Sequence, residues 1–238
     1  MCLNRHAIPA GGRFSRKPAA ARRFTDRESD SAPHVHVASG TVADTLLYHD
    51  VQTLREKTLH DDAPEWGGPF SHQTFYDGYS EFYCAYVDGR PLGALTATRA
   101  GRGRLACEEY YPRDFLREER DRVVSTTQLN VITPTETDGF SRRRIIRLLV
   151  TRMWQDQLAR GIRYDLIHAS VRHMATYRQL GYLQVARSFF VHPVSRAPSY
   201  VMLLPADRSH ACCVHDLFRG LTSPASAENA GKYLELIP

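Results

Sequence analysis

The fold of this chain is decided by residues 123–182, which read VVSTTQLNVITPTETDGFSRRRIIRLLVTRMWQDQLARGIRYDLIHASVRHMATYRQLGY. Val123–Ile132 is rich in β-branched residues and ends at a Thr-Pro pair, which predicts a strand. Ser141–Arg160 carries apolar side chains at helical spacing and is followed by a glycine, which predicts a long helix. The pattern repeats, with a strand predicted over Tyr164–His168 and a helix over Val171–Leu180. Two strands joined by a helix in one sheet form a right-handed parallel crossover, so this stretch predicts a sheet covered by helices.

Further elements are predicted on both sides of this unit. A helix is expected to begin at Thr41 or Asp44 and to be followed by a loop over Asp61–Pro69. Its expected apolar face consists of Leu46, Leu47, Val51, Leu54 and Leu59. The other predicted elements are a hairpin over Phe82–Val87 and Pro91–Thr98, a strand over Leu105–Tyr111, a short helix over Pro112–Asp121, strands over Tyr182–Val191 and Tyr200–Leu204, and a terminal helix near Val214–Leu221. This order predicts an α/β (mixed α+β) fold, with a mixed sheet of about six to seven strands flanked by helices.

The composition predicts a soluble, cytoplasmic protein. The chain has 238 residues, of which 42% are hydrophobic, and its mean hydropathy is −0.41. No apolar run approaches the roughly 20 residues that a membrane span requires. The five cysteines are odd in number and scattered, without a C-x-x-C pair of zinc-site spacing. We therefore expect neither a disulfide framework nor a metal site.

The charge distribution divides the chain into three segments. Residues 1–38 are expected to be a flexible basic tail, because seven Arg and Lys lie in the first 27 residues among Gly, Ala, Pro and Ser. Residues 39–205 are expected to form the functional domain, and residues 206–238 a C-terminal extension. The net charge of +5 favours an acidic partner. A nucleic-acid- or protein-binding module driven by the tail is one alternative, but no aromatic-interleaved basic stripe or recognition helix supports nucleic-acid binding.

Three consecutive arginines follow Ser141 at the start of the long predicted helix: Arg142, Arg143 and Arg144. Free backbone N–H groups and the positive end of the helix dipole make such a position an anion site, and the arginines would strengthen it. The alternative is that these arginines simply face water, since cations at a helix N-terminus oppose the dipole. We expect a phosphate-bearing ligand to bind at this anion site.

The end of the deciding stretch, residues 177–182, reads Tyr-Arg-Gln-Leu-Gly-Tyr. This hexapeptide resembles the Tyr-x-x-Leu-Gly-Phe signature of GNAT-like acyltransferases, with Tyr182 in the aromatic place, and it follows the same order of strand, long helix, strand and helix. The resemblance covers roughly Glu81–Leu204 and implies a GNAT-like central twisted sheet. It also implies that the start of the long helix, Ser141–Arg144, holds the phosphates of the acyl donor.

The phosphate loop departs from the usual GNAT pattern. Ser141–Arg144 lacks the glycines that permit close backbone approach to coenzyme A. The GNAT-like enzymes that tolerate this are the N-acyl amino acid synthases and the acyl-homoserine lactone synthases, whose donor is generally an acyl chain on acyl carrier protein. The resemblance therefore implies an acyl thioester on acyl carrier protein or on CoA as co-substrate, without a metal. An acidic carrier protein with its phosphopantetheine phosphate would suit the three arginines.

The resemblance implies roles on the donor side of the reaction. Tyr177 takes the place of the general acid that protonates the leaving thiolate, although it could instead be a core tyrosine. The thioester carbonyl would be polarised by backbone amides of the splayed central strand. These amides belong to Asn130, Val131, Ile132 and Thr133.

The acceptor side is less defined. The candidate bases are His173, Glu108 and Glu109, and Gln128 could orient a water molecule. Arg55 and Asp77 could contact the amine and carboxylate of the acceptor or form surface ion pairs. Tyr79 belongs to a group of aromatic residues that could line an acyl tunnel or fill the core.

Together these features predict an N-acyltransferase that moves an acyl group from a phosphopantetheine thioester to the amine of an amino acid or a related small molecule or peptide. The alternatives are an acetyl-CoA-dependent N-acetyltransferase and an acyl-homoserine lactone synthase.

Overall fold

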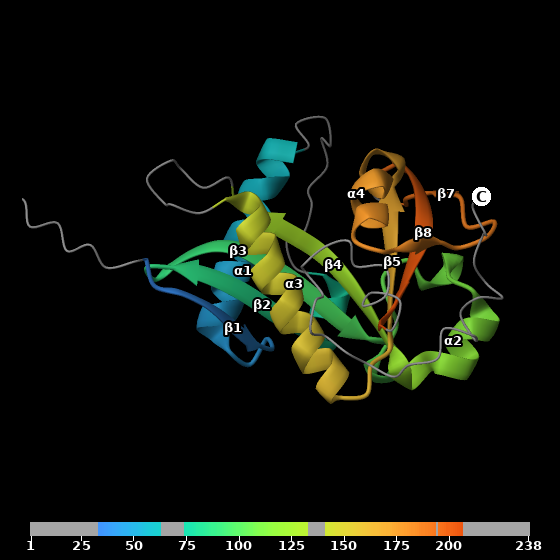
Figure 1. Ribbon diagram of the computed structural model, residues 1–238, viewed down its shortest axis with the longest axis horizontal. Helices are drawn as coiled ribbons and strands as arrows, with labels where there is room; N and C mark the ends of the chain where they lie inside the picture. Colours follow the sequence, from blue (N-terminus) through green and yellow to red (C-terminus); the bar gives the residue numbers. More distant parts are fainter. Residues whose placement is uncertain (1–32, 63–73, 133–140, 194, 207–238) are drawn as a thin grey trace, which may run out of the picture. The chain divides into compact units, whose positions relative to one another are not determined.

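A single mixed sheet organises the part of the chain that the structure describes. The computed structural model describes residues 33–62, 74–132, 141–193 and 195–206. Its eight strands have the order β1-β2-β3-β4-β5-β8-β6, and β7 also pairs with β8 (Figure 1). Among these residues all pairs are antiparallel except β4 with β5. The predicted mixed sheet with flanking helices is confirmed.

Strands and helices are interspersed along the chain from Val35 to Pro205. In chain order they are β1 (Val35–Gly40), α1 (Thr45–Asp62), η1 (Phe75–Tyr79), β2 (Ser80–Val87), β3 (Arg90–Arg99), η2 (Ala100–Arg102), η3 (Glu108–Tyr110), α2 (Arg113–Glu119), η4 (Arg120–Arg122), β4 (Val123–Val131), α3 (Arg142–Ala159), β5 (Tyr164–Ser170), η6 (Val171–His173), α4 (Met174–Gln179), β6 (Leu183–Gln184), β7 (Phe190–Val191) and β8 (Pro198–Pro205). None of the described helices is both long and apolar enough to cross a membrane.

Helix α3 covers one face of β2, β3 and β4 (Figure 1). Ser141 caps it, because the Ser141 side chain accepts a hydrogen bond from the Arg144 amide at 3.2 Å. Ile145 is fully buried in the core that α3 makes with the sheet. A Cβ on Gly93 of β3 would lie 2.7 Å from Ile145 Cγ2, so the absence of a side chain there lets the helix approach. The long helix is confirmed.

Helix α1 covers the opposite face of the same strands. Asp44 is its cap, since Asp44 Oδ1 accepts the Leu47 amide at 3.1 Å. Leu47 and Val51 are buried against Phe82 of β2, as expected. The expectation that Leu46 shares this apolar face is wrong, because Leu46 is 79% exposed and its position on α1 turns it away from the sheet.

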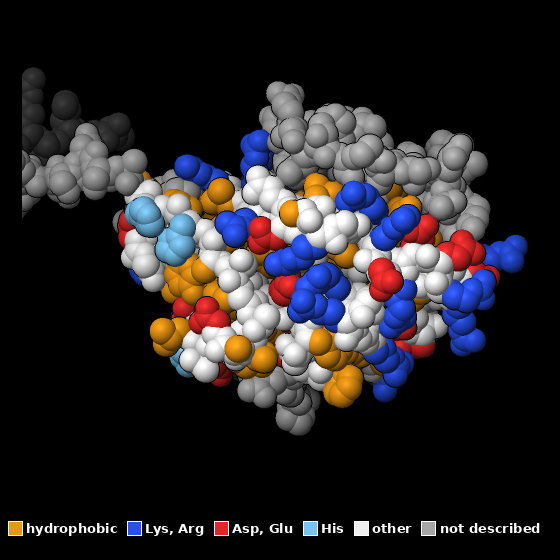
Figure 2. Space-filling model, turned by 90° about the horizontal axis from the view of Figure 1, so that it is seen from below, with side chains coloured by type: hydrophobic (Ala, Val, Ile, Leu, Met, Phe, Trp, Pro, Cys, Tyr) orange, Lys and Arg blue, Asp and Glu red, His pale blue; other side chains and the backbone are white. Residues whose placement is uncertain are grey.

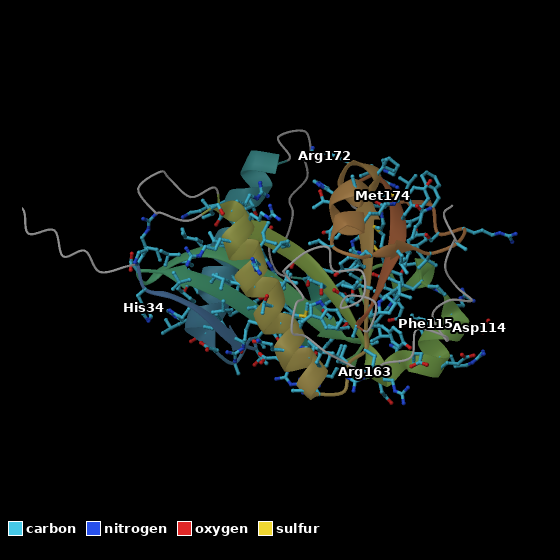
Figure 3. The ribbon with its side chains drawn as sticks, in the orientation of Figure 1. His34, Asp114, Phe115, Arg163, Arg172 and Met174 are labelled. Carbon is cyan, nitrogen blue, oxygen red and sulfur yellow. The ribbon has the colours of Figure 1, made fainter. Side chains whose placement is uncertain are left out.

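A second core lies under the C-terminal strands. Phe115 of α2, labelled in Figure 3, and Leu166 of β5 are buried in it. The expected strand over Leu105–Tyr111 is wrong. That segment turns instead, with Cys107 at φ 58, and then forms the short 3-10 helix η3. Its apolar residues fill the second core without entering the sheet.

Three other expectations need correction or lie outside the described residues. The strand expected over Tyr182–Val191 is wrong over most of its length, because only the two-residue strands β6 and β7 form within it. Strand β1 has no counterpart among the predicted elements and begins at Val35, inside the segment expected to be tail. The helix expected near Val214–Leu221 lies outside the described residues.

Candidate active site

The candidate active site is the region where β4 and β5 diverge. These parallel strands pair at only two positions, Val123 with Tyr164 and Val124 with Asp165. Beyond them β4 and β5 continue without pairing to each other among the described residues, and Figure 1 shows them separating. We call residues 125–131 of β4 and 166–170 of β5 the splay. The divergence expected next to the central strand is confirmed, and it leaves the facing edges of both strands without a ladder partner.

Strand β4 contains a bulge within the splay. Gln128 has a left-handed φ of 51, and the register with β3 shifts here, so that Gln128 and Leu129 together lie opposite Leu95. A bulge of this kind bends the strand and re-aims the groups that follow it. The exposed Gln128 side chain lies at the point where the direction of β4 changes.

The bulge determines which β4 amides point into the splay. Ile132 donates its N–H to the Leu92 carbonyl of β3 at 3.0 Å. Because successive amides of a strand point to opposite edges, the Asn130 amide also faces β3 and the Val131 amide faces the splay. Among the expected carbonyl-polarising amides that the structure describes, Val131 is therefore the one directed there, and Thr133 lies outside the described residues.

Asp165 closes the narrow end of the splay. Its carboxylate accepts hydrogen bonds from the Thr126 amide at 2.9 Å, from the Thr126 hydroxyl at 2.6 Å and from the Tyr182 hydroxyl at 2.5 Å. Asp165 is fully buried. Burial raises its pKa to about 6, although these hydrogen bonds oppose the rise. Sequence analysis missed Asp165, because its partners are 39 and 17 residues away.

Tyr177 lies next to this buried carboxyl group. Gly181, at φ 96, ends α4 and lets Tyr182 donate its N–H back to the Tyr177 carbonyl at 3.1 Å. The two tyrosine rings then meet edge to face, with centroids 5.4 Å apart. Burial, and secondarily the charge of Asp165, raises the pKa of Tyr177. The phenol is therefore protonated at neutral pH, as a general acid must be.

The start of α3 lies at the open end of the splay, since Ile145 in the first turns of α3 and Val131 at the end of β4 both lie against Gly93. Ser141 and all three arginines that follow it are exposed. Arg172, in η6 just before α4, is also exposed and lies at the same end of the sheet (Figure 3). Several cations thus surround the open end of the splay.

Arg55 and Asp77 form a buried ion pair on the α1 side of the sheet. Arg55 Nη1 lies 2.8 Å from Asp77 Oδ2, and Arg55 Nη2 also donates to Thr96 of β3 at 2.8 Å. Burial would raise the pKa of Asp77, but the hydrogen bonds and charge of Arg55 lower it below its usual range. Asp77 also accepts from Tyr48 and Thr74. The structure therefore brings these two candidates together as an ion pair, and the pair is buried and not on the surface.

The expected bases lie in two separate places, with Glu108 and Glu109 together in η3 and His173 in η6. Glu108 is paired with Arg120 at 2.9 Å, and the exposed Glu109 is paired with Arg104 at 3.0 Å. Both belong to η3, not to a strand bordering the acceptor site as expected. His173 is exposed at the start of α4. Tyr79, in η1, donates its hydroxyl to the Arg104 carbonyl at 2.7 Å, which ties η1 to the loop before η3.

Sequence analysis also missed a polar group on the other face of the splay. The Tyr111 hydroxyl lies 3.4 Å from both Ser125 Oγ of β4 and His168 Nδ1 of β5. The His168 ring is 5.0 Å from the His192 ring. Burial lowers the pKa of His168 to about 4, with a further contribution from His192, and burial raises the pKa of Cys107 beside them to about 12. Both imidazoles are neutral at physiological pH.

The sequence was compared with protein families and curated proteins. Residues 68–205 match the family model described as N-acyl amino acid synthase FeeM. This match spans more than half of the chain and includes β2 to β8. A comparison with curated proteins found no match.

Solved structures with the same fold include three acyl-transferring enzymes. FeeM, an N-acyl amino acid synthase from uncultured soil microbes, has a TM-score of 0.58 and 15% identity over 76% of this chain and 95% of its own. The acyl-homoserine lactone synthase LasI has a TM-score of 0.57 and 14% identity over 76% and 96%. BjaI, a CoA-dependent acyl-homoserine lactone synthase described with SAM and isopentyl-CoA, has a TM-score of 0.53 and 14% identity over 81% and 92%. At 14–15% identity, the similarity between this chain and these structures shows that they share a fold and nothing more.

Proposed function

The chain belongs to the N-acyl amino acid synthase FeeM family and is an acyltransferase, and from this premise we propose that it transfers an acyl group from a phosphopantetheine thioester on acyl carrier protein to the amine of an amino acid or a related small molecule. The observation that carries the proposal is the splay. The Val131 amide of β4 is directed into it, the protonated Tyr177 phenol of α4 lies beside it, and the arginines of α3 lie at its open end.

The entrance favours a phosphate-bearing arm. The N-terminus of α3 provides backbone N–H groups and Arg142, Arg143 and Arg144 at the open end of the splay. A phosphopantetheine arm bound there would enter the splay beside the end of β4. Its thioester carbonyl would then accept a hydrogen bond from the Val131 amide, which the bulge leaves without a partner in β3.

The reaction follows from this placement. The acceptor amine, after losing a proton, attacks the thioester carbonyl carbon, and the Val131 amide stabilises the negative charge that develops on the oxygen. The carbon–sulfur bond then breaks, the Tyr177 hydroxyl donates its proton to the departing thiolate, and the proton that the nitrogen loses on becoming an amide restores the phenol. Burial and the neighbouring Asp165 carboxyl keep that hydroxyl protonated until this step. Most of the rate would come from aligning donor and amine.

The acid role of Tyr177 is tested by the Tyr177→Phe variant. We expect kcat to fall by about 10²- to 10⁴-fold with little change in the KM of the donor, because the phenol acts on the leaving group. Products would be measured by mass spectrometry with a panel of acyl carrier proteins, acyl-CoAs and amino acids. The control is Tyr86→Phe, which removes a phenol of β2 that donates a hydrogen bond to Asp50 of α1. Full activity in Tyr177→Phe would contradict the mechanism.

The carrier-protein donor is tested by charge removal at the entrance. Replacing Arg142, Arg143 and Arg144 with alanine should raise the KM for acyl carrier protein and flatten its salt dependence. The matched control replaces three exposed arginines at the far side of the sheet with alanine. These are Arg113, Arg117 and Arg122 of α2 and η4.

The two triple variants carry the same charge change, so net charge alone would affect them equally. Figure 2, which views the molecule from below, shows that the face around α2 is also rich in Lys and Arg side chains. If only the control variant loses carrier use, the carrier docks on that face and the donor-entry proposal is wrong. If neither does while acyl-CoA is used well, CoA is the donor.

A further inference from the structure

Three side chains from separate segments meet beside the splay: Cys107 from the turn before η3, His168 from β5 and His192 from the turn after β7. Their ligand atoms all lie within 4.8 Å of one another. We infer that these residues form a binding site for a single divalent metal ion of the Zn²⁺ class. The proposal is independent of the acyltransfer function.

The donor set fits this class of ion. One thiolate and two imidazoles are borderline-soft ligands, which suit Zn²⁺ and Co²⁺ and exclude Mg²⁺ and Ca²⁺. Metal–ligand bonds of about 2.0–2.3 Å place tetrahedral ligands about 3.3–3.8 Å apart, so small side-chain rotations close the site. Three protein ligands leave a fourth position for water.

The surroundings of the cluster support a site. Cys107 is only 7% exposed, and its sulfur lies within 4.8 Å of a ring nitrogen of both His168 and His192. A buried thiol that converges with two imidazoles from separate segments places three metal-ligand atoms around one point. The Phe190 ring, 6.4 Å from each imidazole ring, forms an apolar wall that would limit the access of water.

The outer nitrogens of the imidazoles have different partners. His168 Nδ1 lies 3.4 Å from the Tyr111 hydroxyl oxygen. In the tautomer that is protonated at Nδ1, this N–H can donate a hydrogen bond to that oxygen, and Nε2 is then available to bind the metal. His192 Nδ1 accepts the Ser195 amide at 3.1 Å. A metal at Nδ1 would displace that amide, and a metal at Nε2 would move the proton to Nδ1. Metal binding must therefore break the bond to Ser195 in either case.

The proton balance of binding is simple. The Cys107 thiol releases one proton to the buffer and its sulfur binds as a thiolate, while both imidazoles bind as neutral ligands. No electron is transferred. The Ser195 amide, freed from His192, becomes exchangeable with solvent.

The test uses Co²⁺ added to the full chain with Cys2, Cys212 and Cys213 replaced by serine, so that these thiols cannot contribute. We expect one Co²⁺ per chain, a thiolate-to-cobalt charge-transfer band, displacement by Zn²⁺ and faster hydrogen exchange at Ser195. No stoichiometric binding, or no charge-transfer band, would overturn the proposal. This measurement needs no activity, so its failure leaves the acyltransferase proposal standing.

Variants then assign the ligands. Cys107→Ser should abolish the charge-transfer band, and His168→Gln or His192→Gln should weaken Co²⁺ binding by at least about 100-fold, the upper loss seen for outer-shell partners. The matched control is Cys84→Ser, which changes another buried thiol, on β2. A band that survives Cys107→Ser, or one that is lost in Cys84→Ser, would refute the assignment. Circular dichroism would verify that each variant is folded.

Discussion

The Asp165 carboxyl group should make the free energy of unfolding depend on pH, and the Asp165→Asn substitution should remove that dependence. Its pKa rises from 3.8 to about 6 in the folded chain. The folded state therefore binds this proton more tightly than the unfolded state does. The free energy of unfolding should fall as the pH rises from about 4 to about 6, and this contribution should be constant at higher pH.

The size of the effect follows from the same pKa values. At about 1.36 kcal/mol per pKa unit, a rise from 3.8 to about 6 corresponds to about 3 kcal/mol. No charged side chain contributes to this shift. The groups that interact with Asp165 are Thr126, Tyr182, Tyr177 and Tyr111, and none of these titrates between pH 4 and 6.

The assay compares wild type with Asp165→Asn by urea unfolding at several pH values. Asn keeps one acceptor oxygen for the Thr126 amide and cannot ionise, so the wild-type stability minus the variant stability should fall by about 2–2.5 kcal/mol between pH 4 and pH 7, the rest of the effect lying below pH 4. The difference between wild type and variant is used because the buried His168 also makes stability depend on pH. Its pKa is lowered, so its contribution has the opposite sign, but it is the same in both proteins and cancels. Asp114→Asn, which removes an exposed carboxylate from an ion pair with Arg117, is the control for the loss of one negative charge. A difference that is flat or rises with pH would refute the reasoning.

Two further substitutions test the packing of the helices on the sheet. Gly93→Ala should destabilise the chain by about 1–3 kcal/mol, because the new Cβ would lie 2.7 Å from Ile145, whereas Gly78→Ala, with no atom within 4 Å, should change stability by less than about 0.5 kcal/mol in the same urea assay. Equal effects of the two would show that α3 can shift. Arg55→Met should cost about 3–5 kcal/mol, because it leaves Asp77 charged and buried without its partner. Adding Asp77→Asn should restore part of that loss, and strictly additive effects in the double-mutant cycle would contradict the coupling.

The elements that could be predicted from sequence are those that local signals specify. Helix α3 has a serine cap, an apolar face and a terminal glycine within one stretch, and its observed bounds, Arg142–Ala159, differ little from the prediction. The β2–β3 hairpin was equally accessible, because Asp88 and Gly89 both adopt the positive φ that its tight turn requires. Neither element depends on a distant partner to be recognised.

The failures come from segments whose conformation is determined by distant contacts. Leu105–Tyr111 has the apolar content of a strand, yet its residues pack under β5 and β8 from a turn, because the second core needs a cover there. β1 was missed because VHVASG has a weak pattern and pairs with β2 far along the chain. Tertiary context overrides β-propensity in both cases.

The same division holds for the candidate site. Tyr177 could be selected because residues 177–182 resemble the GNAT signature, a signal that lies within one short segment, and its role as the acid stays a prediction. The ion pair of Arg55 and Asp77 could be named but not recognised as buried. The cluster of Cys107, His168 and His192 could not be recognised from sequence, because zinc-site spacing is visible only within one segment and these ligands come from three.

Asp165 explains why the splay exists at all. In a continued parallel ladder the Thr126 amide would donate to a carbonyl of β5, but here it donates to the Asp165 side chain. The strands can therefore separate after two pairs without leaving a buried N–H group unsatisfied, which would be costly. The same carboxylate accepts the Tyr182 hydroxyl and so positions the turn that carries Tyr177. One buried side chain thus separates the strands and places the proposed acid beside them, so Asp165→Asn should also lower the rate of acyl transfer, by less than Tyr177→Phe does.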